Sequence, residues 1–492
     1  MRVVVIGAGV GGLTTAALLA KAGLEVTVLE AHTYPGGSAG TFFHQGYRFD
    51  AGATLLAGFD KGGVFARLER VLGLEFPVRR LSEGEGLIRI WLPAGRTVDR
   101  PVGRSHERAA QLEAFGPSVE GFWAWQERRA RALWSLAAGL PFPPGDLGEF
   151  LRLARAGVPW AGQHLRELPG ILADFVRPTS AHAPPVPAFR RFLNAQLLIA
   201  SQTDADRTYA LFGAAALDLP HRGPVMPSGG MGAVAETLAR AVEAYGGTVL
   251  YRHRAGKLVV QEGRVRAVEV ALGGRRRGQR EVLEADLFVA NLTPGNLAGL
   301  LGRPGTPPSD GWGAFVIHAV VPQSDLPPGP PYRQWAGEGD GVFVSLSDEG
   351  DSRRGPVGAR VLSASVHTPL SVWRGLSREE YQARKKAWQE RVEKQVERII
   401  PGFGESARLI LGASPRTFAF YTSRQDGWVG GYPQTHPFRT PSPKTPYPNL
   451  FRVGETIFPG QSVPAVAMGG IRVAEGILTK LEAPSGRGLR LG

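Results

Sequence analysis

Three glycines near the amino terminus have the spacing that lets a polypeptide backbone hold a pyrophosphate. Gly7, Gly9 and Gly12 form a G-x-G-x-x-G pattern, and Gly11 adds a further glycine within it. Gly7 permits a tight turn, Gly9 lets the phosphates approach the backbone, and Gly12 allows a helix to pack closely on a strand. A helix that begins here presents free N–H groups and a partial positive charge to an anion. The pattern therefore predicts a dinucleotide site.

The segments around these glycines are those of a β–α–β unit. Residues 3–6 form an all-apolar run typical of a buried parallel strand, and residues 25–29 form a second one. Between them, residues 13–22 predict a helix that Gly23 closes. Glu30 ends the second strand, where a carboxylate accepts hydrogen bonds from an adenosine ribose. This order favours a nucleotide site over a plain glycine turn, and it suits NAD or FAD equally.

Two further glycine-containing segments decide between these cofactors. Pro35-Gly36-Gly37-Ser38-Ala39-Gly40-Thr41 follows Glu30, and Tyr47-Arg48-Phe49-Asp50-Ala51-Gly52-Ala53 comes next. With them the sequence resembles the FAD-dependent phytoene desaturase and carotenoid isomerase family, a part of the amine-oxidase-like group. In that family the P-G-G stretch runs along the pyrophosphate and flavin, and the F-D-x-G segment lies beside the isoalloxazine. The resemblance implies FAD as the cofactor, with contacts at Gly36, Gly37, Ser38, Thr41, Gly52 and Ala53.

The carboxyl-terminal part contains another strand, turn and helix. Residues 450–455 predict a strand that enters a glycine turn, and residues 464–478 predict a helix with Ser462 as its N-cap. In the resembled family the turn contacts the flavin phosphates and ribityl chain, and the helix N-terminus faces the flavin pyrimidine. The positive end of that helix would stabilise the negative charge of a reduced ring. The implied contacts are Gly454, Glu455, Val463 and Pro464.

The middle of the chain supplies the remaining strands of this unit. Strands are predicted over residues 248–251, 258–261 and 265–272, and a buried strand over 285–291 ends at Asn291. The resemblance implies that Ala255, where the family usually has valine, touches the adenine through its backbone, and that the last strand returns to the flavin at Asn291.

A second glycine cluster raises the alternative of a separate nicotinamide site. Gly230, Gly232 and Ala235 fit G-x-G-x-x-A and precede a predicted helix over residues 233–244. However, Pro224 and Pro227 make the preceding segment a poor central strand. An arginine, not an acid, stands twenty residues after Gly232. We therefore expect no nicotinamide site.

We expect an α/β fold, in which a Rossmann-like FAD-binding domain of the amine-oxidase-like type carries an α+β substrate domain and a helical cap. Residues 1–73, 223–295 and 446–482 are assigned to a discontinuous FAD-binding domain. Residues 74–222 and 296–445 are assigned to the substrate-binding domain, and the resemblance places residues 418–422 near the substrate cavity.

The predicted helical part near residues 105–200 interleaves aromatic and basic side chains, such as Trp123, Trp125 and Arg128. Tryptophan and arginine beside apolar faces suit a monotopic membrane contact, but they suit equally a helical cap packed on its own core. The sequence leaves both alternatives open. We expect a cytoplasmic protein that is peripheral on the inner face of the membrane.

Composition excludes several classes of protein. The 492 residues are 43% hydrophobic and 21% charged, which excludes wholesale disorder. There is no cysteine, so disulfides, thiolate nucleophiles and Fe–S clusters are excluded, and the ten histidines form no H-x-x-x-H pair. We therefore predict no metal site. The net charge is +13, but no nucleic-acid-binding motif accompanies it, so no nucleic acid is expected as a partner.

Residues 35–59, 201–219 and 343–368 look most like the carotenoid C-3′,4′ desaturase branch of the family. This implies dehydrogenation of an apolar polyene: a hydride passes from an allylic carbon to the flavin, a proton is lost, and a double bond forms. Because the polyene delocalises the positive charge, the reaction needs no elaborate acid–base pair, and we predict no catalytic residue. Quinone or oxygen is the expected electron acceptor. The alternatives are a cis–trans isomerase or saturase of carotenoids and a non-catalytic carrier of apolar ligands.

Overall fold

The computed structural model describes residues 1–139, 144–145, 147–305, 308–337, 339 and 341–482. Its central element is a five-stranded parallel sheet, which confirms the predicted α/β class. The strands, in spatial order, are β19 (Leu450–Arg452), β13 (Leu287–Ala290), β1 (Arg2–Ile6), β2 (Glu25–Glu30) and β9 (Thr248–Tyr251).

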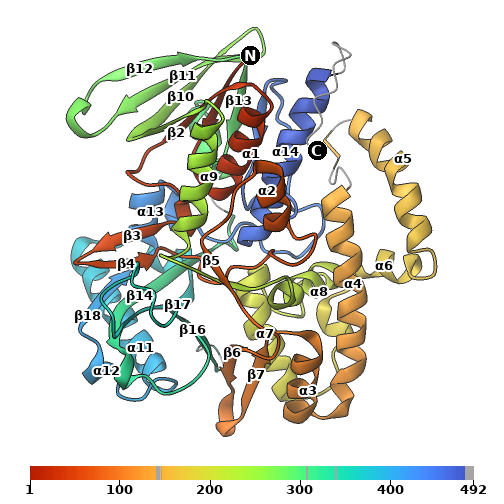
Figure 1. The fold of residues 1–492 in the computed structure, drawn as a ribbon, viewed down its shortest axis with the longest axis vertical. Coiled ribbons are helices and arrows are strands. Elements are labelled where there is room, and N and C mark those ends of the chain that lie inside the picture. The colour runs from red at the N-terminus through yellow and green to blue at the C-terminus, as the bar shows by residue number, and fades with distance from the viewer. Residues whose placement is uncertain (140–143, 146, 306–307, 338, 340, 483–492) are drawn as a thin grey trace.

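Both faces of this sheet are covered, as its largely apolar strands require. Val3 and Val5 of β1 pack toward the helices α1 (Val10–Lys21), α9 (Gly232–Ala244) and α14 (Val463–Glu482). Val4 and Ile6 point to the other face, which is covered by the antiparallel sheet of β10 (His253–Gln261), β11 (Arg264–Leu272) and β12 (Arg280–Glu284). Figure 1 shows these layers in the upper half of the molecule.

Helix α1 begins at Val10, three residues before the predicted start, so that boundary was wrong. The glycines Gly11 and Gly12 are part of its first turn. A Cβ at Gly12 would lie 2.4 Å from the Gly7 carbonyl oxygen and 2.9 Å from Cβ of Asn291. Glycine propensity disfavours a helix here, but the close approach of α1 to β1 overrides it because only glycine fits.

A second sheet of seven strands lies below the first in Figure 1. Its spatial order is β18 (Leu409–Ala413), β14 (Trp312–Pro322), β17 (Ala359–Pro369), β16 (Gly341–Leu346), β15 (Tyr332–Ala336), β6 (Gly86–Trp91) and β7 (Thr97–Pro101). All its neighbouring pairs are antiparallel except β15 with β6. Helix α11 (Arg378–Glu397) covers one face through Val392 and Val396, which pack with Phe315 and Trp373.

Most of the remaining helices form a cap beside the second sheet. They are α3 (Arg104–Phe115), α4 (Glu120–Gly139), α5 (Leu147–Gln163), α6 (Leu168–Asp174), α7 (Pro187–Ser201) and α8 (Ala210–Asp218). Trp123 of α4 packs against Phe189 and Phe192 of α7, and Trp125 stacks on His182, so both tryptophans are buried within the protein. Among the described helices, none combines the length and the apolar character needed to cross a bilayer.

Shorter elements connect these layers. They are α2 (Val64–Leu72), α10 (Pro294–Leu300), α12 (Phe403–Ser406), α13 (Pro415–Thr422), the hairpin of β3 (Thr41–His44) and β4 (Tyr47–Asp50), and the pair of β5 (Val78–Arg80) and β8 (Val225–Pro227). Strand β8 is only three residues long, and it pairs with β5 on one side and through a single bridge from Val225 to Leu56 on the other. This agrees with the prediction that its prolines bar it from a central position.

Candidate functional site

A cavity of 1070 Å³ lies between the carboxyl ends of the parallel strands and the seven-stranded sheet. It brings together segments from the amino and carboxyl ends of the chain. Thirteen of the predicted cofactor residues line it: Gly7, Gly9, Glu30, Gly36, Gly37, Ser38, Gly52, Ala53, Ala255, Asn291, Gly454, Glu455 and Val463.

Four predicted residues lie behind the cavity wall, where they support it. Gly11 and Gly12 let α1 approach its neighbours, and a Cβ at Gly11 would lie 3.0 Å from Val466 of α14. The Thr41 hydroxyl donates to Asp50, and Pro464 packs against Gly58. Direct contact with FAD stays a prediction for these four residues and for the thirteen that line the cavity.

The nucleotide end of the cavity has the groups that an ADP moiety requires. Gly9 is the N-cap of α1 and offers no side chain to cap the helix, so the N–H groups of the first turn remain available to an anion. Glu30 lies at the end of β2, and its carboxylate accepts hydrogen bonds from the backbone N–H groups of Ala8 at 2.9 Å and His32 at 2.8 Å. These bonds fix the carboxylate toward the position expected for a ribose.

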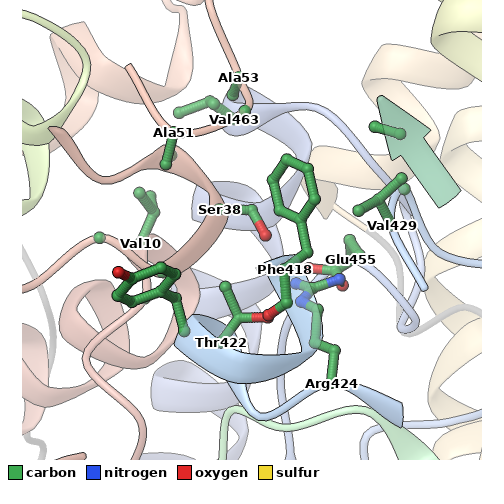
Figure 2. Close-up of a pocket in the computed structure, with 18 of the residues that line it drawn as sticks. Val10, Ser38, Ala51, Ala53, Phe418, Thr422, Arg424, Val429, Glu455 and Val463 are labelled. Carbon is green, nitrogen blue, oxygen red and sulfur yellow. The ribbon is translucent and has the colours of Figure 1, made fainter. Parts of the chain in front are cut away.

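One buried polar atom fits the proposed cofactor directly. The Ser38 hydroxyl oxygen has no hydrogen-bond partner among the described residues, although Ser38 lies in the cavity wall. Figure 2 shows this hydroxyl on the side of Ser38 that faces Phe418. A flavin dinucleotide carries phosphate and hydroxyl oxygens that would satisfy such a group. The residues present therefore fit FAD.

Asp50 joins the glycine segments behind the cavity. Its Oδ1 accepts hydrogen bonds from the Thr41 hydroxyl and the Met231 N–H, both at 2.8 Å, and its Oδ2 pairs with Arg354. The Gly232 N–H donates to the Thr41 hydroxyl oxygen at 2.8 Å. The N–H groups of Met231 and Gly232 in the second glycine cluster are thus already bonded within the protein and are not free to bind a phosphate.

The seven-stranded sheet forms the floor of the other part of the cavity. Ala314, Val316 and His318 alternate along β14, and Ser365 and His367 alternate along β17, so all five project from one face. In the register of the sheet Ala314 lies opposite His367, and Val316 lies opposite Ser365. The floor is therefore made of small or uncharged side chains.

Both histidines of the floor are held neutral by their surroundings. Burial lowers the pKa of His367 to about 4 and, together with the charge of Arg354, lowers that of His318 to about 3. His318 shares a 3.0 Å hydrogen bond with the Ser363 hydroxyl. His367 lies 3.1 Å from Nε2 of Gln202, whose φ of +60° is rare for a residue other than glycine. Backbone strain of this kind clusters at functional sites.

A buried ionic network borders the cavity away from the glycine motifs. Arg100 lines the cavity and donates to Glu107 at 2.6 Å and to the Gln196 side-chain oxygen at 2.8 Å. Burial alone would raise the pKa of Glu107, but the charges of Arg100 and His221 outweigh it and lower the pKa to about 2. The carboxylate is therefore ionised, and it fixes Arg100 in place.

Residues 415–431 close the cavity from the side of α13. Phe418, Tyr421 and Thr422 line it, as the resemblance implied, and Figure 2 shows Phe418 projecting into it. Asp426 is not on this wall, because its carboxylate pairs with Arg374 at 2.7 Å on the surface. Sequence reasoning missed His367, Gln202 and Arg424. The polar residues at alternate positions of the apolar strand β17 were the available signal for His367.

Comparison with known proteins agrees with this geometry. The profile of the flavin containing amine oxidoreductase family matches residues 10–478. The chain belongs to this family. Among curated relatives, prolycopene isomerase from Daucus carota is 24% identical over 97% of the chain and 80% of the relative. Hydroxyneurosporene desaturase from Cereibacter sphaeroides is 31% identical over 61% of the chain and 58% of the relative.

Solved structures share the fold. Cyclohexylamine oxidase from Brevibacterium oxydans superposes with a TM-score of 0.61 at 16% identity, over 98% of the chain and 99% of that protein. The family match shows that the protein is an FAD-dependent oxidoreductase, and the curated relatives that it resembles are named as a prolycopene isomerase and a hydroxyneurosporene desaturase. The prediction of FAD as cofactor is confirmed.

Proposed function

We propose that this enzyme dehydrogenates a long polyene of the carotenoid type and transfers the hydride to FAD. The observation that carries the proposal is the continuity of the cavity, which runs from the glycine motifs into an apolar section. That section is lined by Ile88, Ile199, Ala216, Leu219 and Phe343. The names of the relatives, prolycopene isomerase and hydroxyneurosporene desaturase, support a substrate of this class.

FAD would supply the hydride acceptor, and the protein's own residues would position the polyene and exclude water. The sheet floor contributes to this through its electrostatics. Loss of a hydride leaves positive charge on the polyene, and a charged imidazole beside it would oppose that change. Because burial keeps His318 and His367 neutral, the floor does not repel the developing cation. Quinone or oxygen would then reoxidise the flavin.

The second candidate is isomerisation of a cis-configured polyene without net oxidation. It is favoured by the similarity to prolycopene isomerase, which extends over 97% of the chain, whereas that to the desaturase covers 61%. The same cavity would serve both reactions, because each needs an apolar polyene beside the flavin.

Anaerobic mixing of the FAD-loaded protein with a defined polyene separates the two candidates. Hydroxyneurosporene and prolycopene would be supplied in detergent micelles, and flavin absorbance and pigment spectra would be followed together. Dehydrogenation predicts bleaching of the flavin with an equal amount of a product that absorbs at longer wavelength. A changed cis–trans composition without net oxidation, in the oxidised protein or after chemical reduction of its flavin, would favour isomerisation. Tight polyene binding with no change in either flavin state would favour the carrier.

We also propose that helices α5 and α6 rest on an anionic membrane surface. The side chains of Leu147, Phe150, Leu151 and Val158 on α5 are exposed, although they are large and apolar. Between α4, α5 and α6 lies a groove of 320 Å³ with an almost wholly apolar wall. An exposed patch of this kind on a helix is typical of an interfacial contact.

The charges around this patch favour an anionic lipid surface. Each described acidic side chain of the segment pairs with a basic one: Glu149 with Lys444 at 3.0 Å, and Asp174 and Glu167 with Arg129 at 2.7 Å. The arginines Arg152, Arg155 and Arg166 are exposed. The face is therefore apolar and basic, which complements anionic lipid headgroups.

A further inference from the structure

Two opposite charges from distant parts of the chain meet in the cavity wall. The guanidinium of Arg424 lies 2.6 Å from a carboxylate oxygen of Glu455, and both side chains are largely buried, with exposed fractions of 14% and 21%. Arg424 also donates to the Trp428 carbonyl oxygen at 3.2 Å. Figure 2 shows the pair facing one another next to Phe418, and both residues line the cavity.

The position of Glu455 requires a compensating charge. Glu455 follows the strand β19 and the glycine Gly454, at the carboxyl edge of the parallel sheet where FAD would bind. The cofactor brings a pyrophosphate to this edge, and a reduced flavin ring adds further negative charge. An uncompensated carboxylate in a partly desolvated cavity would repel these groups. Arg424 is placed to cancel that repulsion.

We propose that Arg424 is a positioning residue that acts through Glu455. By neutralising the carboxylate, it lets Glu455 remain beside FAD as a hydrogen-bond acceptor without opposing the negative charge of the cofactor. Arg424 comes from the loop after α13, which closes the substrate side of the cavity, whereas Glu455 comes from the parallel-sheet side. FAD affinity and the flavin potential therefore depend on a residue outside the glycine motifs.

The alternative is a direct contact between Arg424 and the phosphates or ring of FAD. The two cases differ in the response to a second substitution. If Arg424 acts through Glu455, removal of the Glu455 charge makes Arg424 dispensable. If Arg424 contacts FAD, its loss remains costly whether Glu455 is charged or not. A double-mutant cycle therefore separates the two.

The experiment uses the full-length protein, stripped of flavin and titrated with FAD by fluorescence. We expect Arg424→Gln to raise the Kd for FAD at least tenfold, and Arg424→Gln/Glu455→Gln to return it to within threefold of Glu455→Gln alone. The midpoint potential of bound flavin should fall by about 30 mV in Arg424→Gln and recover in the double variant. For a two-electron couple this shift means that the reduced, more negative flavin loses tenfold more affinity than the oxidised form. Equal weakening in the single and double variants, or no effect of Arg424→Gln, would overturn the proposal.

Two further variants guard against a general loss of folding. Arg374→Gln breaks the surface ion pair with Asp426, which belongs to the same loop as Arg424 but lies off the cavity wall. It should leave both FAD affinity and potential unchanged. Arg424→Lys keeps the positive charge and should retain most of the affinity, and a tenfold loss in it would count against charge compensation. The inference rests on FAD binding alone, so failure of polyene dehydrogenation would not affect these readouts.

Discussion

Asp50 and Arg354 lie 304 residues apart in the sequence, and their side chains form an ion pair of 2.8 Å in the interior of the protein. Their side chains are only 7% and 6% exposed. Asp50 ends the hairpin strand β4, and Arg354 belongs to the loop between β16 and β17. The pair thus ties the seven-stranded sheet to the glycine segments through the hydrogen bonds that Asp50 makes with Thr41 and Met231.

Breaking this ion pair should destabilise the fold strongly. Arg354→Gln leaves the Asp50 carboxylate buried without its partner, which typically costs about 3–5 kcal/mol. Urea unfolding followed by tryptophan fluorescence measures the loss. Arg374→Gln, which breaks an exposed pair with Asp426, serves as the matched control and should cost less than about 1 kcal/mol. Equal effects of the two variants would show that burial does not decide the strength of the pair.

Two glycines of the same helix α14 should respond oppositely to alanine. A Cβ at Gly470 would lie 2.7 Å from the Gly11 carbonyl oxygen and 2.8 Å from Cβ of Thr14, so Gly470→Ala forces α14 away from α1. We expect a loss of about 1–3 kcal/mol in stability and weaker FAD binding, because α1 carries the phosphate loop.

At Gly476 a Cβ meets nothing within 4 Å, so Gly476→Ala should stabilise the helix by about 0.5–1 kcal/mol. Thermal unfolding and FAD titration of both variants check this pair of predictions. A stable Gly470→Ala protein with normal FAD affinity would contradict the close packing of α1 and α14.

Acidification below neutral pH should destabilise the protein through the two histidines of the cavity floor. The folded protein holds His318 and His367 neutral, with pKa values of about 3 and 4 instead of the usual 6.5. The unfolded chain therefore binds these protons first, and the stability that the neutral forms contribute is present above pH 6.5 and is lost as the pH falls toward 4. At pH 5 the loss should be about 2 kcal/mol for each histidine.

The measurement is the free energy of unfolding in urea at pH 7.5, 6.5, 5.5 and 5.0. The slope of the unfolding free energy against pH gives the number of protons taken up on unfolding, and His367→Gln should reduce this number by close to one. His106→Gln replaces an exposed histidine and should leave the slope unchanged. A slope in His367→Gln equal to that of the unaltered protein would show that His367 is charged or accessible in the folded state.

The membrane proposal predicts binding to vesicles of anionic lipid. The protein should co-sediment with vesicles of phosphatidylglycerol and only weakly with vesicles of phosphatidylcholine. High salt should reduce the binding to phosphatidylglycerol. Phe150→Glu/Leu151→Glu should lower partitioning at least tenfold, because each buried apolar side chain contributes about 1.5–3 kcal/mol. Val282→Glu is the control, since Val282 is exposed on β12 away from α5. Equal loss in both variants, or no vesicle binding, would exclude α5 as the contact.

Local sequence patterns were sufficient to predict the elements that depend only on neighbouring residues. The apolar strands β1 and β13, the glycine turn after β1 and helix α9 follow from periodicity, and their structures lie close to the predicted bounds. The start of α1 was wrong because glycine disfavours helices locally, while the contact of Gly12 with Gly7 and Asn291 exists only in the folded protein. A sequence pattern carries no information about such a distant neighbour.

The sequence by itself determined that the cofactor is a dinucleotide. Phosphate binding needs glycine backbone and a helix N-terminus, and both follow from the order of neighbouring residues. The sequence also excluded a cysteine nucleophile among these 492 residues, since they contain no cysteine. Only the tertiary structure decided that Arg424 pairs with Glu455 and that His318 and His367 face the cavity as neutral groups. It also decided that Asp50 accepts a hydrogen bond from the Met231 N–H. Those outcomes depend on burial and on contacts between residues far apart in the chain, which arise only when the sheets and helices pack together.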